Sequence, residues 1–235
     1  MRAAYSSSYE NKIIAFKGVL VVSAQDGSKV EPHRGAAGNL RQFAASFVQA
    51  RMEGFTKDMQ ICLTPVPSKA RSGPTHAYFP ALMACCGTLE YLAGLYSGRT
   101  KPCGDEELSG YAAKFLPQPA YAPDAIHILH CALRHSIAHR GIATGVWVDR
   151  KPGANRRVTW RVGAETKAPS IVLKAEEGSL TRDSPWPCRY THRVHIRLGR
   201  LWRDIRESAH AYCLDLSTPQ TFANFEACMH RLYPA

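Results

Sequence analysis

The sequence lacks the motifs with which nucleotide-driven enzymes bind phosphate. Neither Gly-x-x-x-x-Gly-Lys nor Gly-x-Gly-x-x-Gly occurs in its 235 residues, and each motif is needed to turn backbone N–H groups toward a phosphate. Eight cysteines are present, but no two have the Cys-x-x-Cys spacing of zinc knuckles. Four cysteines lie within apolar helical patterns, where cysteine is usually a small buried hydrophobe, so we expect free thiols in a reducing compartment. These four are Cys85, Cys86, Cys131 and Cys213.

Long apolar runs are missing as well. No stretch approaches the roughly 18 uninterrupted apolar residues of a transmembrane helix. The short apolar run in Lys12–Val22 is interrupted by Lys17 and Gly18 and lacks a good signal-peptide cleavage pattern. We therefore expect no membrane partner and a cytoplasmic location.

Acidic residues are scarce relative to basic ones. Against 30 Lys and Arg stand 19 Asp and Glu, which gives a formal net charge of +11. This excess favours polyanions such as RNA, DNA or an anionic membrane, although many basic proteins bind none of these. The hydrophobic content of 45% is enough for a sizeable core, so the length predicts one domain, or one domain with an appendage.

Helical patterns dominate the chain after residue 38. Apolar residues recur at helical spacing, and Pro or Gly residues mark helix ends. For the first helix, Asn39 is the expected N-cap. The predicted helices are residues 40–62, 75–98, 105–116, 124–141, 195–216 and 219–232. Between the fourth and fifth, β-branched and aromatic clusters predict a small antiparallel excursion, followed by a loop. Its strands are residues 144–148, 158–162 and 170–174, and the loop is 176–187.

The domain organisation follows from these patterns. Residues 1–38 form an N-terminal leader, which is either an accessory strand within Ile13–Ser23 or a disordered segment. Residues 39–235 form one mainly α domain with a β insertion at about 142–175.

The helix predicted for Asp124–Gly141 carries the residues with chemical potential. Beside its apolar stripe lie Arg134, His135 and His139. Arginine is a permanent cation whose fork fits phosphate, and histidine takes up or releases a proton near neutral pH. Together on one rigid helix, these are the fewest side chains required to bind or cleave a phosphodiester.

The six residues Arg134–His139 read R-H-S-I-A-H and resemble the R-(Asn/His/Asp)-x-x-x-H motif of the HEPN superfamily. The order of elements over residues 39–232 also resembles bacterial HEPN-like proteins: a long apolar helix, a short helix, the motif helix, a hairpin-like stretch and two further helices. The resemblance implies an antiparallel helical bundle and, in many members, a metal-independent endoribonuclease that is often dimeric.

The resemblance assigns roles to the motif residues. His139 would be the general base or acid, since its ordinary pKa lies near working pH, and Arg134 would stabilise charge on the phosphoryl oxygens. Residues five apart on a helix point about 140° apart, so the two side chains do not easily converge on one phosphorus. The resemblance implies a homodimer, in which the Arg of one chain and the His of the other lie in a shared cleft. His135 and, more weakly, Ser136 would support them, and no cofactor is required.

Glu90 is an acid inside the apolar helix 75–98. An unpaired buried charge is costly, so we expect Glu90 to bind Arg134 or a histidine of the motif helix. The alternative is a carboxylate at the helix edge that reaches solvent.

Arginines at helical spacing in and before helix 195–216 resemble a ridge that follows phosphates, with Arg193, Arg197 and Arg200 on one face. The alternative is a solvated face paired with Asp204 and Glu207. The predicted RNA-binding residues are Arg140, Arg156, Arg157, Arg193, Arg197, Arg200 and Arg203.

A metal site is one alternative for the motif helix. His135 and His139 form H-x-x-x-H, and His127 and His130 precede them. However, the zincin pattern requires Glu at the position of Ser136, and a structural zinc would need two further ligands. The favoured prediction therefore contains no metal.

A non-catalytic module that binds RNA or a protein is the other alternative, because fold does not fix function. Arg134 and His139 would then anchor the helix to Glu90 and backbone carbonyls.

HEPN proteins often act as toxins or in antiviral defence. Some are restrained by a nucleotidyltransferase that modifies a tyrosine two residues after the motif histidine. Gly141 at that position argues against this control. The expected partners are RNA, a second copy of the chain, and an antitoxin or regulatory protein.

Overall fold

The computed structural model shows a mainly helical protein with a small four-stranded sheet. This confirms the mainly α fold class, whereas the specific HEPN bundle stays a prediction. The structure describes residues 13–16, 20–22, 37–67, 74–75, 77–99, 101, 103–135, 137, 145–151, 153, 155–180 and 188–232.

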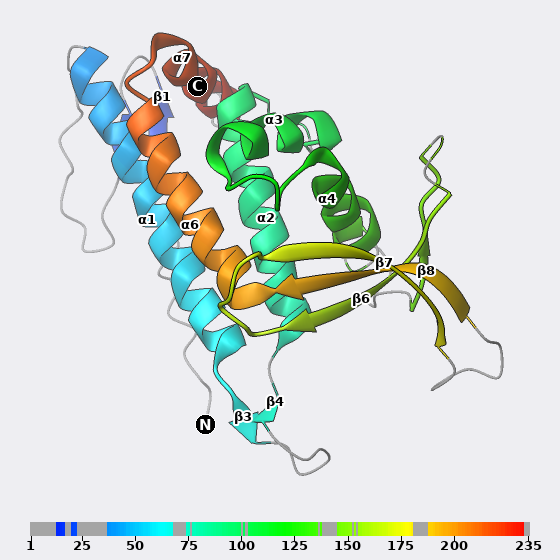
Figure 1. The fold of residues 1–235 in the computed structure, drawn as a ribbon. Coiled ribbons are helices and arrows are strands. Elements are labelled where there is room, and N and C mark those ends of the chain that lie inside the picture. Colours follow the sequence, from blue (N-terminus) through cyan, green and yellow to red (C-terminus); the bar gives the residue numbers. More distant parts are fainter. Residues whose placement is uncertain are drawn as a thin grey trace.

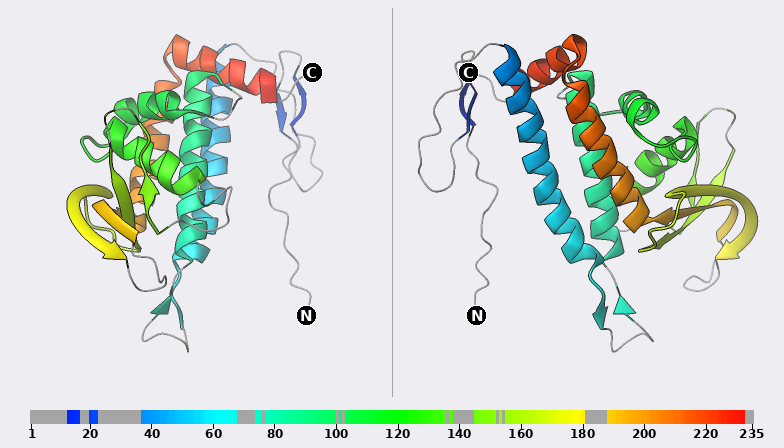
Figure 2. Two further views of the ribbon diagram at one scale, coloured as in Figure 1. Left: turned by 90° about the vertical axis from the view of Figure 1, so that its right-hand side faces the viewer. Right: turned by 60° about the vertical axis from the view of Figure 1, so that its left-hand side comes forward.

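Three long helices, α1, α2 and α6, lie side by side and form the core of the protein (Figures 1 and 2). The helix α7 crosses the end of α2. On the side of α2 away from α1, α3 and the segment η1 (Ile128–Arg134) contact α2, and α4 packs on α3. Because α2 has neighbours on several sides, its sequence is apolar around most of its circumference. The bounds are α1 Ala37–Leu63, α2 Tyr78–Ser97, α3 Asp105–Phe115, α4 Pro123–His127, α6 Leu198–Asp215 and α7 Pro219–Leu232.

The helix ends follow from the residues that stand there. Gly98 ends α2 in the left-handed region at φ 71°, where glycine has no steric penalty. A Cβ at Gly98 would also lie 3.2 Å from the backbone oxygen of Asn224 on α7, so the position needs glycine for two reasons. The predictions for helices 75–98, 105–116 and 219–232 are confirmed to within three residues. Asn39 was expected to cap the first helix, but α1 begins at Ala37, so Asn39 lies inside it.

The small sheet has the strand order β5-β6-β8-β7. The predicted antiparallel arrangement is confirmed for β5 with β6. The strand β8 was not predicted; it pairs antiparallel with β7 and parallel with β6, so the sheet is mixed. The chain reaches β8 only after β7, and β8 then inserts between β7 and β6. The bounds are β5 Trp147–Val148, β6 Arg157–Gly163, β7 Ile171–Leu180 and β8 Cys188–Arg197.

The helix predicted for residues 195–216 is wrong at its start. Residues 195–197 end strand β8, and α6 begins at Leu198. Residues four apart share a face in a strand as well as in a helix, so the spacing of Arg193 and Arg197 could not separate the two structures. Residues 176–180, predicted as loop, extend β7, and residues 181–187 lie outside the described residues.

Two short hairpins complete the described chain. Within the leader, β1 (Ile13–Phe16) pairs antiparallel with β2 (Leu20–Val22), so the single strand predicted there is two strands. The strand β3 (Val66–Pro67) pairs with β4 (Pro74–Thr75) beyond the lower end of α1 (Figure 1). In the part of the chain that the structure describes, no helix has the length and apolar character to cross a membrane.

Candidate functional site

The motif helix changes its winding along its length. Pro123 opens α4, which passes at Ile128 into the wider π-helical turns of η1 (Ile128–Arg134). Such turns are uncommon and often occur at functional sites. Of the predicted apolar stripe, Ile126, Leu129 and Leu133 are buried and Ile137 is half-buried. The buried residues include Ile126, Ile128, Leu129, Ala132 and Leu133.

Arg134 binds Glu90 of α2, which is one of the alternatives that the sequence left open for this acid. Its Nη2 donates a hydrogen bond to Oε2 of Glu90 at 3.0 Å, and its Nε lies 2.6 Å from Oε1. Among the described residues Oε1 accepts no aligned hydrogen bond, so the Nε approach is an ion contact. The side chains of Arg134 and Glu90 are 23% and 17% exposed. The guanidinium is therefore fixed in direction but not fully sealed from solvent.

Two histidines continue this contact into a network of alternating acids and imidazoles. Nε2 of His130 lies 3.7 Å from Oε1 of Glu90, and its Nδ1 lies 2.8 Å from Oδ1 of Asp105. The other carboxylate oxygen of Asp105 is hydrogen-bonded to Nδ1 of His127. Nε2 of His127 lies 3.2 Å from Oδ1 of Asp149. The network thus joins α2, α3, the motif helix and the segment after β5.

Two acids of the network, Asp105 and Asp149, are held in their charged forms. Burial alone would raise the pKa of Asp105, but hydrogen bonds from His127 and His130 lower it overall. Burial also opposes the charge of Asp149, whose pKa is nevertheless lowered by the backbone N–H of Lys151 and by Arg156. Both carboxylates are therefore ionised at neutral pH.

Cys131 departs from the prediction of a plain core residue. It is half-buried, and its thiol lies 3.8 Å from Oδ1 of Asp105. Burial raises the pKa of this thiol to about 11, and the charge of Asp105 acts in the same direction. The other three cysteines predicted as buried, Cys85, Cys86 and Cys213, are buried.

The remaining motif residues fall mostly outside the described residues. Ser136, His139 and Arg140 belong to this group. His135 is exposed, and its ring lies 4.6 Å from the ring of His130. The described site is consequently the Arg134 end of the motif.

Arg156 was predicted to bind RNA, but the structure places it in the network. Its Nη2 donates to Asp149 at 2.8 Å and its Nη1 to Asp124 at 2.8 Å, and its side chain is 12% exposed. Arg157 is exposed and donates from Nε to the carbonyl oxygen of Arg189 at 2.7 Å. Of this pair, Arg157 is the one that offers its charge to solvent.

The predicted ridge of arginines on one helix is wrong, because Arg193 and Arg197 lie on β8. Arg193 pairs with Glu176 at 2.8 Å, and Arg197 donates to backbone carbonyls before β7. Arg200 on α6 pairs with Asp204 at 2.7 Å, while Arg203 is exposed. The arginines are thus divided between two elements.

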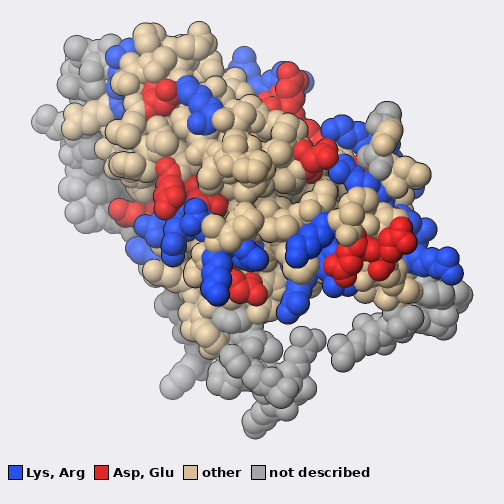
Figure 3. Space-filling model, viewed as in Figure 1, with Lys and Arg blue, Asp and Glu red and all other residues tan. Residues whose placement is uncertain are grey.

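Strand register gathers a different set of basic residues. Lys174 of β7 lies opposite Arg193 of β8, and Arg161 of β6 lies opposite His195. Burial lowers the pKa of His195, and the charges of Lys174, Arg161 and Arg193 lower it further. Like charges opposite one another are unfavourable, so this basic sheet face, defined by Arg161, Lys174, Arg193 and His195, favours an anion. Glu176, which pairs with Arg193, already supplies part of that negative charge. Lys and Arg also gather over the sheet and the adjoining helix ends in Figure 3.

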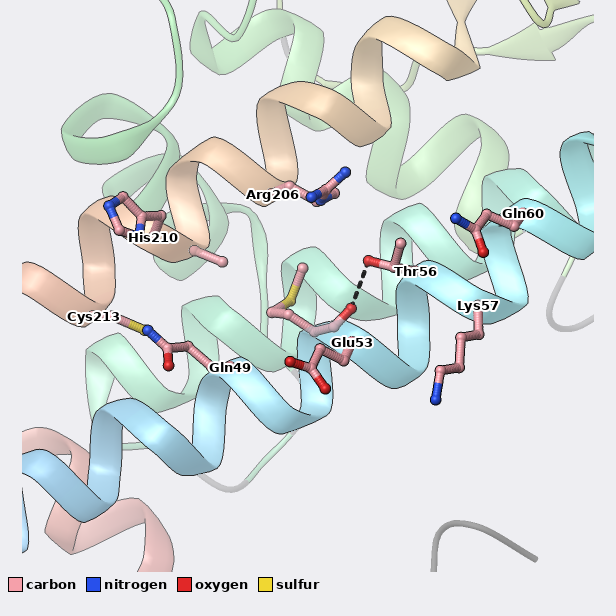
Figure 4. A pocket seen from close by; sticks show the side chains of 10 residues that line it. Gln49, Glu53, Thr56, Lys57, Gln60, Arg206, His210 and Cys213 are labelled. Carbon is pink, nitrogen blue, oxygen red and sulfur yellow. Dashed lines mark hydrogen bonds between the residues drawn. The ribbon is translucent and has the colours of Figure 1, made fainter. Parts of the chain in front are cut away.

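A groove of about 470 Å³ lies between α1 and α6 (Figure 4). Glu53 and Lys57 reach it from α1, and Arg206 and His210 from α6. It contains charges of both signs and none of the predicted catalytic residues.

No protein-family model, no curated protein and no solved structure matches this chain.

Proposed function

We propose that this protein is a metal-independent endoribonuclease of the HEPN type. The observation that supports this best is the contact of Arg134, through Nε and Nη2, with Glu90 of α2, which fixes the direction of the guanidinium. In the sequence, Arg134 and His139 belong to the same predicted helix. A guanidinium held in one direction is suited to bind a phosphoryl oxygen, because it needs no reorganisation during the reaction.

The reaction uses the 2′-OH of RNA as its nucleophile. His139 accepts the 2′-OH proton, the 2′-oxygen forms a bond to phosphorus, and the bond from phosphorus to the 5′-oxygen breaks. The leaving 5′-oxygen takes up a proton, and a 2′,3′-cyclic phosphate remains. Arg134 stabilises the charge that develops on the phosphoryl oxygens.

A homodimer completes the site in this proposal. On the regular α-helix that the sequence predicts for residues 134–139, Arg134 and His139 would point about 140° apart, so in this proposal Arg134 of one chain acts with His139 of the other. RNA binds through its phosphates to the basic sheet face, which replaces the predicted helical ridge. This activity fits a cytoplasmic toxin or defence effector that is inhibited by an antitoxin.

The direct test is cleavage of end-labelled total RNA in excess EDTA. We expect the wild type to leave 2′,3′-cyclic phosphate ends and both Arg134→Ala and His139→Ala to lose about 100-fold or more in rate. Arg51→Ala on α1 and His210→Ala on α6 are matched controls that should retain activity. Cleavage that survives in both motif variants would overturn the proposal.

A non-catalytic RNA- or protein-binding module is the second candidate. It is favoured by the same ion pair, because Glu90 already neutralises part of the Arg134 charge. Glu90→Gln separates the two functions: a positioning role predicts slower cleavage at unchanged RNA affinity. If the folded wild type cleaves nothing but shifts RNA on a gel, the binding module is the better description.

A further inference from the structure

Three side chains bring metal-ligand atoms together beside the motif helix. A carboxylate oxygen of Asp105, a ring nitrogen of His127 and the sulfur of Cys131 all lie within 4.8 Å of one another. Each of the three residues is half-buried, so the cluster is shielded and still accessible to an entering ion. This group was not predicted, because Asp105 is 22 residues before His127 in the sequence.

The fold explains why these three meet. His127 is the last residue of α4, and Cys131 follows one turn later in η1, so both project from one face of the motif helix. Asp105 is the first residue of α3, where a carboxylate is favoured by the helix dipole. Since α3 packs on α4, the start of α3 faces that side of the motif helix.

A second set of contacts orients these side chains as metal ligands are usually oriented. Nδ1 of His127 faces Asp105, while its Nε2 lies 3.2 Å from Oδ1 of Asp149. The side chain of Asp149 is 0% exposed and is itself held by Arg156. A ligating histidine commonly gives its second N–H to such a carboxylate, which fixes the tautomer and the ring.

Asp105 is fixed in the same way from its other side. Its Oδ1 receives Nδ1 of His130 at 2.8 Å, and this contact leaves Oδ2 toward His127. Oδ1 thus faces both His130 and the thiol of Cys131, and Oδ2 faces His127.

We propose that Asp105, His127 and Cys131 bind one Zn²⁺ or a similar transition-metal ion. A set of one sulfur, one nitrogen and one oxygen suits Zn²⁺ better than Mg²⁺ or Ca²⁺, which prefer oxygen alone. Binding releases the thiol proton of Cys131 and the proton between Nδ1 of His127 and Asp105, because the thiolate and the unprotonated ring nitrogen are the ligands. Three protein ligands leave the fourth tetrahedral position to water. The inference goes beyond the proposed ribonuclease, whose chemistry needs no metal.

The experiment is a Co²⁺ titration of the full-length protein after removal of metal with a chelator. A thiolate–cobalt charge-transfer band in the near ultraviolet should saturate at one equivalent and disappear when Zn²⁺ is added. Cys131→Ser should abolish the band, whereas Cys188→Ser on β8, another half-buried free cysteine, should leave it unchanged. Asp149→Asn should keep the band and weaken Co²⁺ binding about 10- to 100-fold.

The inference is overturned if the wild type gives no saturating band, or if Cys131→Ser gives the same band as the wild type. His127→Ala provides a second variant, so a folding defect in one does not decide the outcome. RNA cleavage in EDTA is measured separately: a cobalt band without cleavage supports the metal site and rejects the ribonuclease, and cleavage without a band does the reverse.

Discussion

At the scale of single residues, Asp204 of α6 is a carboxylate that is buried and paired within the core. Its Oδ2 accepts a hydrogen bond from the Tyr121 hydroxyl at 2.9 Å, and its Oδ1 lies 2.7 Å from Nε of Arg200. Asp204 and Tyr121 are both 1% exposed. The alternative of a solvated arginine face is therefore half right: Arg200 has the predicted local partner, but that partner is buried.

Asp204→Ala should destabilise the fold by about 3–5 kcal/mol, because it leaves a buried hydroxyl and a guanidinium without their acceptor. Urea denaturation monitored by circular dichroism measures this loss. Glu207→Ala, an exposed acid on the same helix, should change stability by less than about 0.5 kcal/mol. Equal effects of the two variants would contradict the assigned role of Asp204.

At the scale of elements, α3 is attached to its neighbours at both ends. Asp105 at its start joins the histidines of the motif helix, and Lys114 near its end pairs with Asp215 of α6 at 2.5 Å. Burial opposes the charge of Asp215, but hydrogen bonds from Lys114 and Thr221 lower its pKa below the ordinary value of 3.8. The contact at Asp215 therefore links the packing of α3 to pH.

Asp215→Asn should reduce stability at pH 7 by about 1 kcal/mol or less, because the pair is partly exposed. A lowered folded-state pKa contributes stability above the unfolded-state value, and this contribution is lost as the pH falls through the folded-state pKa. The difference in the free energy of unfolding between wild type and variant should therefore become smaller below about pH 4. Urea midpoints from pH 7 to pH 2 measure it, and a gap that widens in acid would exclude this role.

The sheet is the element on which RNA binding depends in the proposed function. Replacing Arg161 and Lys174 together by Glu should weaken RNA binding across all sequences and reduce the slope of log K against log salt by about 1–2. Fluorescence anisotropy at several salt concentrations measures both quantities. Lys57→Glu on α1 is the charge control, and an equal loss of affinity in that variant would assign the effect to net charge alone.

At the scale of the whole molecule, the proposed site requires two chains. A symmetric dimer repeats each interface contact, so it would contain two composite sites, each with Arg134 from one chain and His139 from the other. The described residues of one chain contain the Arg134 half of such a site, fixed by Glu90.

Mixing Arg134→Ala with His139→Ala tests this arrangement. After subunit exchange half of the dimers are mixed, and each mixed dimer has one intact site of two, so activity should return to about a quarter of wild type. Each variant exchanged with itself is the control. Inactivity of the mixture, despite exchange verified by mass spectrometry, would place both catalytic groups on one chain.

The sequence by itself determined the helical class and most helix ends, and it limited the expected partners of Glu90 to Arg134, a histidine of the motif helix or solvent. The helical class and the helix ends depend on apolar periodicity and on residues such as Gly98, which act locally. The expectation for Glu90 depends on the free-energy cost of burying an unpaired acid. The spacing of Arg193 and Arg197 did not decide between strand and helix, because both structures place residues four apart on one face.

Only the tertiary structure decided which distant side chains meet. It brought Asp105 and Asp149 from separate elements to the two nitrogens of His127, and it inserted β8 between β6 and β7 to form the basic sheet face. These contacts join residues far apart in the chain through the packing of α3 and the parallel pairing of β6 with β8. No local pattern encodes such packing, because it results from the burial of all elements together.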